Sequence, residues 1–200
     1  MHESFTVLWT ESRCRWLGAA GEFGKPIEVI FGGPHQSAPS LTRFKVAPGD
    51  DVYVLRVRHQ VMYILARLRV SAILPIEDYL RDRLGLPQTL LSLPHWDLEE
   101  KLWTERPELG HRLPSGCISE AAIGKGSPMR LDCDVPSEVL EQIRFRSQRG
   151  ERALKQVKDG KLMNTAGIAC GVYRLAAESA ADFAALVDQA APSPERPRET

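Results

Sequence analysis

The sequence lacks a net charge and a long apolar run, and each absence excludes a class of protein. Its 26 basic and 26 acidic side chains cancel, so no global field attracts the chain to nucleic acid or to an anionic membrane. No segment approaches the roughly 18 to 20 apolar residues of a membrane span, and the first residues lack the basic-then-apolar order of a signal peptide. We therefore expect a soluble, cytoplasmic protein with no membrane partner.

Paired cysteines and nucleotide-binding or protease motifs are also missing. The thiols of Cys14, Cys117, Cys133 and Cys170 never form a CxxC or CxxH pair, which argues against a zinc ribbon and a disulfide framework. No GxSxG, HExxH, Walker or GxGxxG pattern is present. We expect isolated buried thiols, no metal site and no cofactor.

The clearest pattern that is present is a β-hairpin between residues 41 and 70. Residues 41–46 alternate apolar and polar side chains, and the Pro-Gly-Asp-Asp sequence that follows at 48–51 is typical of a turn. Residues 52–58 and 61–70 are two apolar β-prone runs joined by a short connection. The sequence therefore predicts strands in this region, built around one turn and one hairpin.

Other segments complete an α+β fold class. Shorter strands are predicted at residues 5–9, 27–31 and 168–175. Helices are predicted at residues 10–20, 75–85, 136–143, 148–157 and from Ser179 onward. Residues 86–130 are expected to be a helical and irregular insertion, and residues 191–200 a disordered tail of a single domain spanning 1–190.

Residues 47–57, APGDDVYVLRV, followed by residues 63–73, YILARLRVSAI, resemble the PUA-like superfamily, which includes the ASCH, EVE and YTH domains. The resemblance covers about the first 80 residues and, more loosely, residues 140–175. It implies a small, open, mixed β-barrel flanked by helices, with a ligand cleft on its surface. Relatives often bind RNA or DNA, and several accept a modified base in an aromatic pocket. The zero net charge and the long segment 86–130 depart from that pattern.

A base-binding pocket is predicted where the first strand meets the first helix. Two aromatic planes there would sandwich a base, and nearby hydroxyl or guanidinium groups would read its edge. The candidate residues are Trp9, Thr10, Ser12, Arg13 and Trp16. The alternative is that both tryptophans are core residues packed beneath the helix.

Phosphate contacts are predicted from two groups of basic residues. Arg56 and Arg58 lie two apart and project from one face of their strand, as do Arg67 and Arg69. Steps of two to three residues are expected to place the second group along one side of a helix, where a nucleic-acid backbone would lie. This second group is Arg144, Arg146, Arg149, Arg152 and Lys155. The alternative is a solvated helix face.

The leading hypothesis is a non-enzymatic nucleic-acid-binding module, binding RNA or DNA, that recognises a modified or extruded base. A second is a small hydrolase of nucleoside-like substrates, and a third is a protein-interaction domain that uses Trp96 and Trp103. Three compact sequences are weak as chemical sites, because each lacks the spacing or the partners of a known motif. They are His95-Trp96-Asp97, Ser115-Gly116-Cys117 and Gly124-Lys125-Gly126-Ser127.

Overall fold

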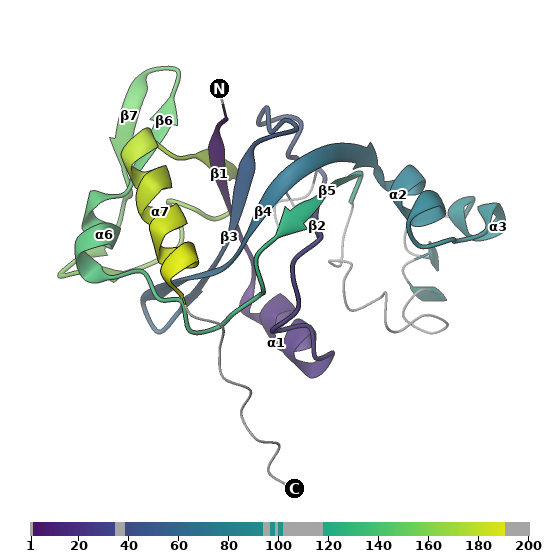
Figure 1. The fold of residues 1–200 in the computed structure, drawn as a ribbon, viewed down its shortest axis with the longest axis horizontal. Helices are drawn as coiled ribbons and strands as arrows, with labels where there is room; N and C mark the ends of the chain where they lie inside the picture. The colour runs from purple at the N-terminus through teal and green to yellow at the C-terminus, as the bar shows by residue number, and fades with distance from the viewer. Residues whose placement is uncertain (1, 35–38, 94–96, 99, 102–117, 191–200) are drawn as a thin grey trace, which may run out of the picture.

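A curled six-stranded sheet forms the centre of the computed structural model, which describes residues 2–34, 39–93, 97–98, 100–101 and 118–190 (Figure 1). The strand order is β10-β1-β3-β4-β5-β2. Only the β1–β3 pair is parallel, and the other pairs in this sheet are antiparallel. Its strands are β1 (Ser4–Leu8), β2 (Val29–Gly32), β3 (Asp51–Arg58), β4 (Val61–Pro75), β5 (Glu120–Gly126) and β10 (Val172–Arg174). The α+β class and the mixed sheet are thus confirmed.

The sheet is buried on both faces, which explains why β3 is almost continuously apolar. Val52 and Val54 point into one core, which also contains residues of helix α1 (Glu11–Ala19). Tyr53 and Leu55 alternate with them and pack in a second core, beneath helix α7 (Ala177–Gln189). In Figure 1, α7 lies across the sheet on the side away from α1.

The helices begin and end at local signals that the sequence contains. The Thr10 hydroxyl caps α1 by accepting a hydrogen bond from the Arg13 backbone N–H, 3.3 Å away. Pro75 precedes α2 (Ile76–Asp82), and Gly85 follows it with a positive φ of 66°. The predicted helices at these positions and at the end of the chain are confirmed. Two further helices within the described residues are α3 (Gln88–Leu91) and α6 (Ser137–Gln142).

Strand β5 lies inside the segment 86–130 that was predicted to be irregular, and that prediction is wrong for residues 120–126. These residues pair with both β4 and β2. The glycines that had indicated a loop permit close packing instead: a Cβ on Gly124 would overlap the carbonyl oxygen of Arg69, and one on Gly126 would overlap Ile27. The Gly124-Lys125-Gly126 run is therefore part of the sheet.

Residues 41–46 form a turn, so the predicted strand there is wrong. Lys45 has a positive φ of 65°, and the backbone N–H groups of Leu41 and Thr42 donate to the carboxylate of Glu120. The Thr42 hydroxyl donates to the same carboxylate. Because one buried side chain from β5 binds these donors, the segment folds back on itself and does not pair with β3. The hairpin itself is β3–β4.

The basic helix predicted at residues 148–157 is also wrong, because this segment belongs to two small hairpins. β6 (Arg144–Ser147) pairs with β7 (Gly150–Ala153), and Gly150 has a φ of 106° after the connecting turn. β8 (Val157–Lys158) then pairs with β9 (Lys161–Leu162). The arginine spacing therefore follows a β-hairpin rather than one side of a helix.

Several predictions fall on residues outside the described ranges. They concern Trp96, Trp103, the trio at 95–97 apart from Asp97, the Ser115-Gly116-Cys117 sequence and the tail 191–200. Among the described helices, none has the length and apolar character needed to cross a membrane.

Candidate functional site

A pocket of about 280 Å³ opens beside α1, on the face of the sheet away from α7. Its walls come from the end of β1, from α1, from the segment that leads into β2, from α2 and from the chain after β5. The lining residues are Trp9, Arg13, Leu17, Glu22, Lys25, Pro26, Ile27, Glu28, Val29, Tyr79 and Met129. Five separate pieces of chain thus converge on one cavity.

Arg13 is the most unusual residue of this pocket. It lies in the first turn of α1, and its guanidinium carbon is 3.9 Å from the centroid of the Trp9 ring. Both residues are buried, with 7% and 5% of their surface exposed. The Trp9 ring therefore covers one face of the guanidinium, and both residues line the pocket.

The Arg13 guanidinium has no carboxylate partner within the described residues. Its Nε atom is buried without a hydrogen-bond acceptor, and no ion pair reaches the group. Burial lowers the pKa of Arg13 to about 10. Burying an unpaired charge costs several kcal/mol, whereas a desolvated cation–π contact returns only about 2 kcal/mol. The Trp9 ring therefore offsets part of this cost and leaves a donor unsatisfied.

The other charged groups make the pocket lining electrically balanced. The Lys25 ammonium lies 3.0 Å from the Glu22 carboxylate, so this pair is already formed. Glu28 is exposed at the pocket and its carboxylate makes no hydrogen bond or ion pair within the described part of the chain. The unsatisfied groups of the pocket are thus one buried cation, Arg13, and one exposed anion, Glu28.

The structure brings two of the five predicted base-binding residues into the pocket, namely Trp9 and Arg13. Trp16 is 38% exposed and does not line it, so the two tryptophan rings do not form the two walls of one site. The hydroxyls of Thr10 and Ser12 lie 3.0 Å apart at the start of α1, outside the lining. These hydroxyls form hydrogen bonds at the N-terminus of α1 and do not reach the pocket.

The predicted phosphate contacts on β3 differ in availability. Arg56 is buried and donates two hydrogen bonds, of 2.9 and 2.7 Å, to the Glu11 carboxylate. This bidentate pair ties β3 to α1 and occupies the guanidinium. Arg58 is exposed at the end of the strand. Only Arg58 of the two presents its charge to solvent.

The basic residues of the β6–β7 hairpin, and Lys155 just after it, are likewise divided. Arg144 donates to the backbone carbonyls of Glu141 and Ile143, and Arg152 lies over the rings of Phe145 and Tyr173 at 5.4 and 5.2 Å. The three remaining residues, Arg146, Arg149 and Lys155, are exposed. Of these, Arg146 lies 3.7 Å from the Glu3 carboxylate. This hairpin is on the α7 side of the molecule, away from α1 (Figure 1).

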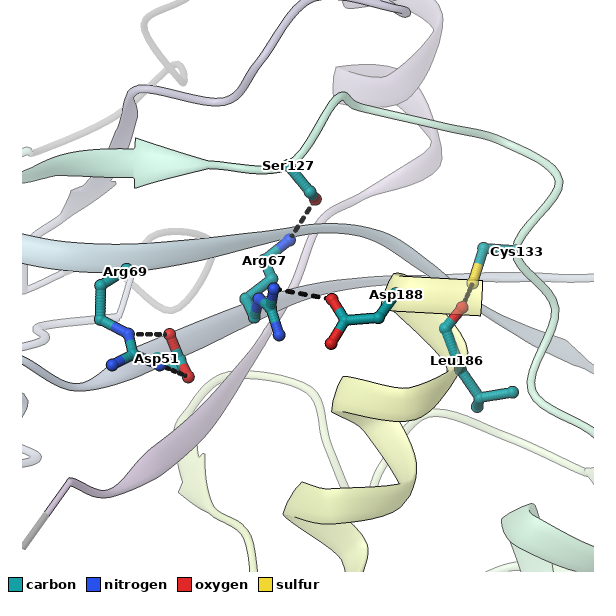
Figure 2. Close-up of polar contacts among 7 residues, drawn as sticks. All are labelled: Asp51, Arg67, Arg69, Ser127, Cys133, Leu186 and Asp188. Atoms are coloured by element: carbon teal, nitrogen blue, oxygen red, sulfur yellow. Dashed lines mark hydrogen bonds and ion pairs between the residues drawn. The ribbon is translucent and has the colours of Figure 1, made fainter. Parts of the chain in front are cut away.

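The arginines of β4 are held by aspartates. Figure 2 shows the Arg67 guanidinium directed at Asp188 near the end of α7, at 2.8 Å, and Arg69 paired through two nitrogens with Asp51. The Cys133 thiol donates to the Leu186 carbonyl nearby, 3.8 Å away. These contacts fasten α7 and β3 to β4 and leave little free positive charge on this face.

The Thr42–Glu120 hydrogen bond is the one hydroxyl–carboxylate contact that bears on hydrolysis among the described residues. Glu120 also accepts hydrogen bonds from two backbone N–H groups, so its acceptor sites are used to hold the turn at 41–46. No group of three metal-ligating side chains occurs in the described segments. The hydrogen bonds of Glu120 therefore have a structural role, which is to hold this turn.

Sequence reasoning missed most of the pocket lining. Glu28, Tyr79 and Met129 are far apart in the chain, and each belongs to a segment with its own structural explanation. Tyr79, for example, shares the apolar face of α2 and packs edge-on against Phe31 at 5.4 Å. No local pattern distinguishes these residues as pocket residues.

Comparison with protein-family models, with curated proteins and with solved structures found no match for this chain.

Proposed function

We propose that this chain is a nucleic-acid-binding module that takes an extruded base, modified or unmodified, into the Trp9–Arg13 pocket. The observation that supports this function is the unpaired, buried guanidinium of Arg13 in the pocket lining. A guanidinium has only donors, so its natural ligand carries acceptors in one plane. The heteroatoms on the edge of a nucleobase meet this requirement.

The size and polarity of the pocket favour a base over a phosphate group. Its volume of about 280 Å³ is near the lower end of small-molecule sites, roughly 300 Å³. Leu17, Ile27 and Met129 supply apolar walls that suit a flat ring. The two carboxylates of the lining offset its two cations, so the pocket has no net positive charge to attract a dianion, whereas a neutral heterocycle needs none.

Backbone contacts would come from exposed cations outside the pocket, and few of the residues predicted to contact phosphate are free for this role. Arg58, Arg149 and Lys155 are available, whereas Arg56 and Arg144 are engaged within the protein. Each phosphate contact adds a slope of about one to the dependence of log affinity on log salt. We therefore expect weak to moderate affinity with a shallow salt dependence, and the base pocket supplies much of the selectivity.

Fluorescence anisotropy with short single-stranded RNA and DNA tests this function. Wild-type protein is expected to bind, and Arg13→Met to lose about 10-fold or more in affinity, since a bidentate arginine–base pair is worth about 1–3 kcal/mol. Arg15→Met is the matched control, because Arg15 is exposed on the same helix and does not line the pocket. Equal binding by wild type and Arg13→Met would contradict the proposal, as would binding of neither nucleic acid.

A further inference from the structure

Two unsatisfied groups of opposite hydrogen-bonding character line the pocket. The Arg13 guanidinium donates only, and the Glu28 carboxylate accepts only. Apart from the contact of Arg13 with the Trp9 ring, neither group has a hydrogen-bond or ion-pair partner within the described residues. A base that fits both must present adjacent acceptors on one edge and N–H donors on another.

We infer that the base selected by this pocket is a guanine-type purine, read by Arg13 on its O6/N7 edge and by Glu28 on its N1–H and 2-amino edge. This inference rests on the proposed function. Among the four bases, only guanine combines two adjacent acceptors on one edge, O6 and N7, with two adjacent donors on another, N1–H and the 2-amino group; cytosine offers O2 and N3 to a guanidinium, but its single 4-amino donor lies on that same edge. Adenine would direct its 6-amino group at the donors of Arg13, which leaves the guanidinium unsatisfied.

The carboxylate adds a second, independent discrimination. Guanine carries a 2-amino group that adenine, cytosine and uracil lack at that position, and Glu28 has no donor of its own to offer a carbonyl. A ligand that directs an acceptor at Glu28 would place two acceptors opposite each other, with no proton to form a hydrogen bond between them. The pair of residues therefore favours guanine, because it alone satisfies Arg13 with one edge and Glu28 with two donors on another.

The experiment uses the full chain and a set of single-stranded oligonucleotides that differ at one central position. The central base is guanine, hypoxanthine, which lacks the 2-amino group, 7-deazaguanine, which lacks N7, or adenine. Dissociation constants are measured by anisotropy. We expect guanine to bind best, with each lost contact costing about 5- to 150-fold, and adenine to bind worst.

Two variants assign the two contacts. In Arg13→Met, the difference between guanine and 7-deazaguanine is expected to vanish while the difference between guanine and hypoxanthine persists. In Glu28→Gln, the hypoxanthine difference is expected to shrink and the 7-deazaguanine difference to persist. Glu28 is exposed, so Glu28→Gln is expected to fold as the wild type does.

The outcomes separate this inference from the proposed function. Oligonucleotide binding that depends on Arg13 but shows no preference for guanine would overturn the inference and leave the base pocket standing. Binding of none of the oligonucleotides would overturn both. A hypoxanthine penalty that is unchanged in Glu28→Gln would remove Glu28 from the assignment.

Discussion

Arg13 carries a stability cost that a paired arginine does not. Replacing it by methionine removes an unpaired buried charge and keeps a long side chain over the Trp9 ring. We predict that Arg13→Met raises the free energy of unfolding by about 1–3 kcal/mol, measured by urea denaturation, while it weakens nucleic-acid binding about 10-fold or more. Gained stability together with lost binding is typical of a residue retained for function.

Arg56→Met is the matched comparison, because Arg56 is equally buried but bonds Glu11 through two nitrogens. Removing it breaks a charge-assisted pair whose carboxylate partner is partly solvated, so a loss of about 1 kcal/mol is expected. The two substitutions should therefore change stability in opposite directions. A loss of stability in Arg13→Met as large as that in Arg56→Met would show that the Arg13 charge is structurally compensated.

Glu11 gives the pair with Arg56 a defined pH dependence. The hydrogen bond from Arg56 lowers the pKa of Glu11 below its ordinary value of 4.5, against an opposing effect of burial. Because the folded pKa is the lower one, the pair stabilises the fold above pH 4.5 and loses this contribution as the pH falls through the folded pKa. We predict that Glu11→Gln is less stable than wild type by under about 1 kcal/mol at pH 7.

Urea titrations of wild type and Glu11→Gln between pH 7 and pH 3 measure this difference. The difference in stability between the two proteins should shrink as the pH falls below 4.5, because the unfolded chain then takes up the proton before the folded carboxylate does. A difference that stays constant down to pH 3 would mean that packing, rather than charge, makes Glu11 stabilising.

At the site, sequence reasoning identified Trp9 and Arg13 because they are close together at a strand-to-helix junction. It failed to identify Glu28, Tyr79 and Met129 because their proximity depends on the path of β2, α2 and the chain after β5. Sequence reasoning also placed Trp16 in the pocket, because the sequence of α1 does not show which side of the helix faces the cavity.

At the scale of elements, Gly124 allows β4 and β5 to pair closely. A Cβ there would overlap the carbonyl oxygen of Arg69 and lie 2.8 Å from its carbonyl carbon. Both atoms belong to backbone, which cannot move aside without disturbing the ladder. We predict that Gly124→Ala lowers the free energy of unfolding by about 3 kcal/mol or more, measured by urea denaturation.

Gly18 in α1 is the control glycine for this substitution. An added Cβ would make ordinary contact with Phe23, at 3.5 Å, and alanine is the better helix former by about 0.5–1 kcal/mol. Gly18→Ala is therefore expected to be neutral or stabilising. If both alanine variants were equally stable, close approach at β5 would not be the reason for the glycine.

The elements that were predicted well are those with strong local signals. The apolar runs of β3 and β4 and the caps of α1 and α2 are visible in the sequence and are present in the structure. The errors at residues 41–46 and 148–157 have physical causes that are less visible. At residues 41–46, the distant carboxylate of Glu120 accepts hydrogen bonds from backbone N–H groups and holds a turn. At residues 148–157, Gly150 follows the turn of a β-hairpin, although the spacing of the arginines is also compatible with a helix.

At the scale of the molecule, one sheet divides two apolar cores. The core on the α1 side includes Trp9 and adjoins the pocket, and the core on the α7 side includes Phe183. Alternate residues of β3 contribute to both, so a change in one core is transmitted through a shared strand. This arrangement leads us to expect that the two sides unfold together.

Phe183→Ala tests that coupling. The Phe183 ring is fully buried and lies 5.5 Å from the Tyr53 ring in an edge-on contact, so its removal should cost about 3–5 kcal/mol. Far-UV circular dichroism and tryptophan fluorescence, which includes Trp9 on the opposite side, are expected to give the same lowered urea midpoint. Phe44→Ala, at a ring that is 38% exposed, should change either midpoint little. Separate midpoints in Phe183→Ala would mean that the pocket side folds independently of α7, contrary to the single domain expected from the sequence.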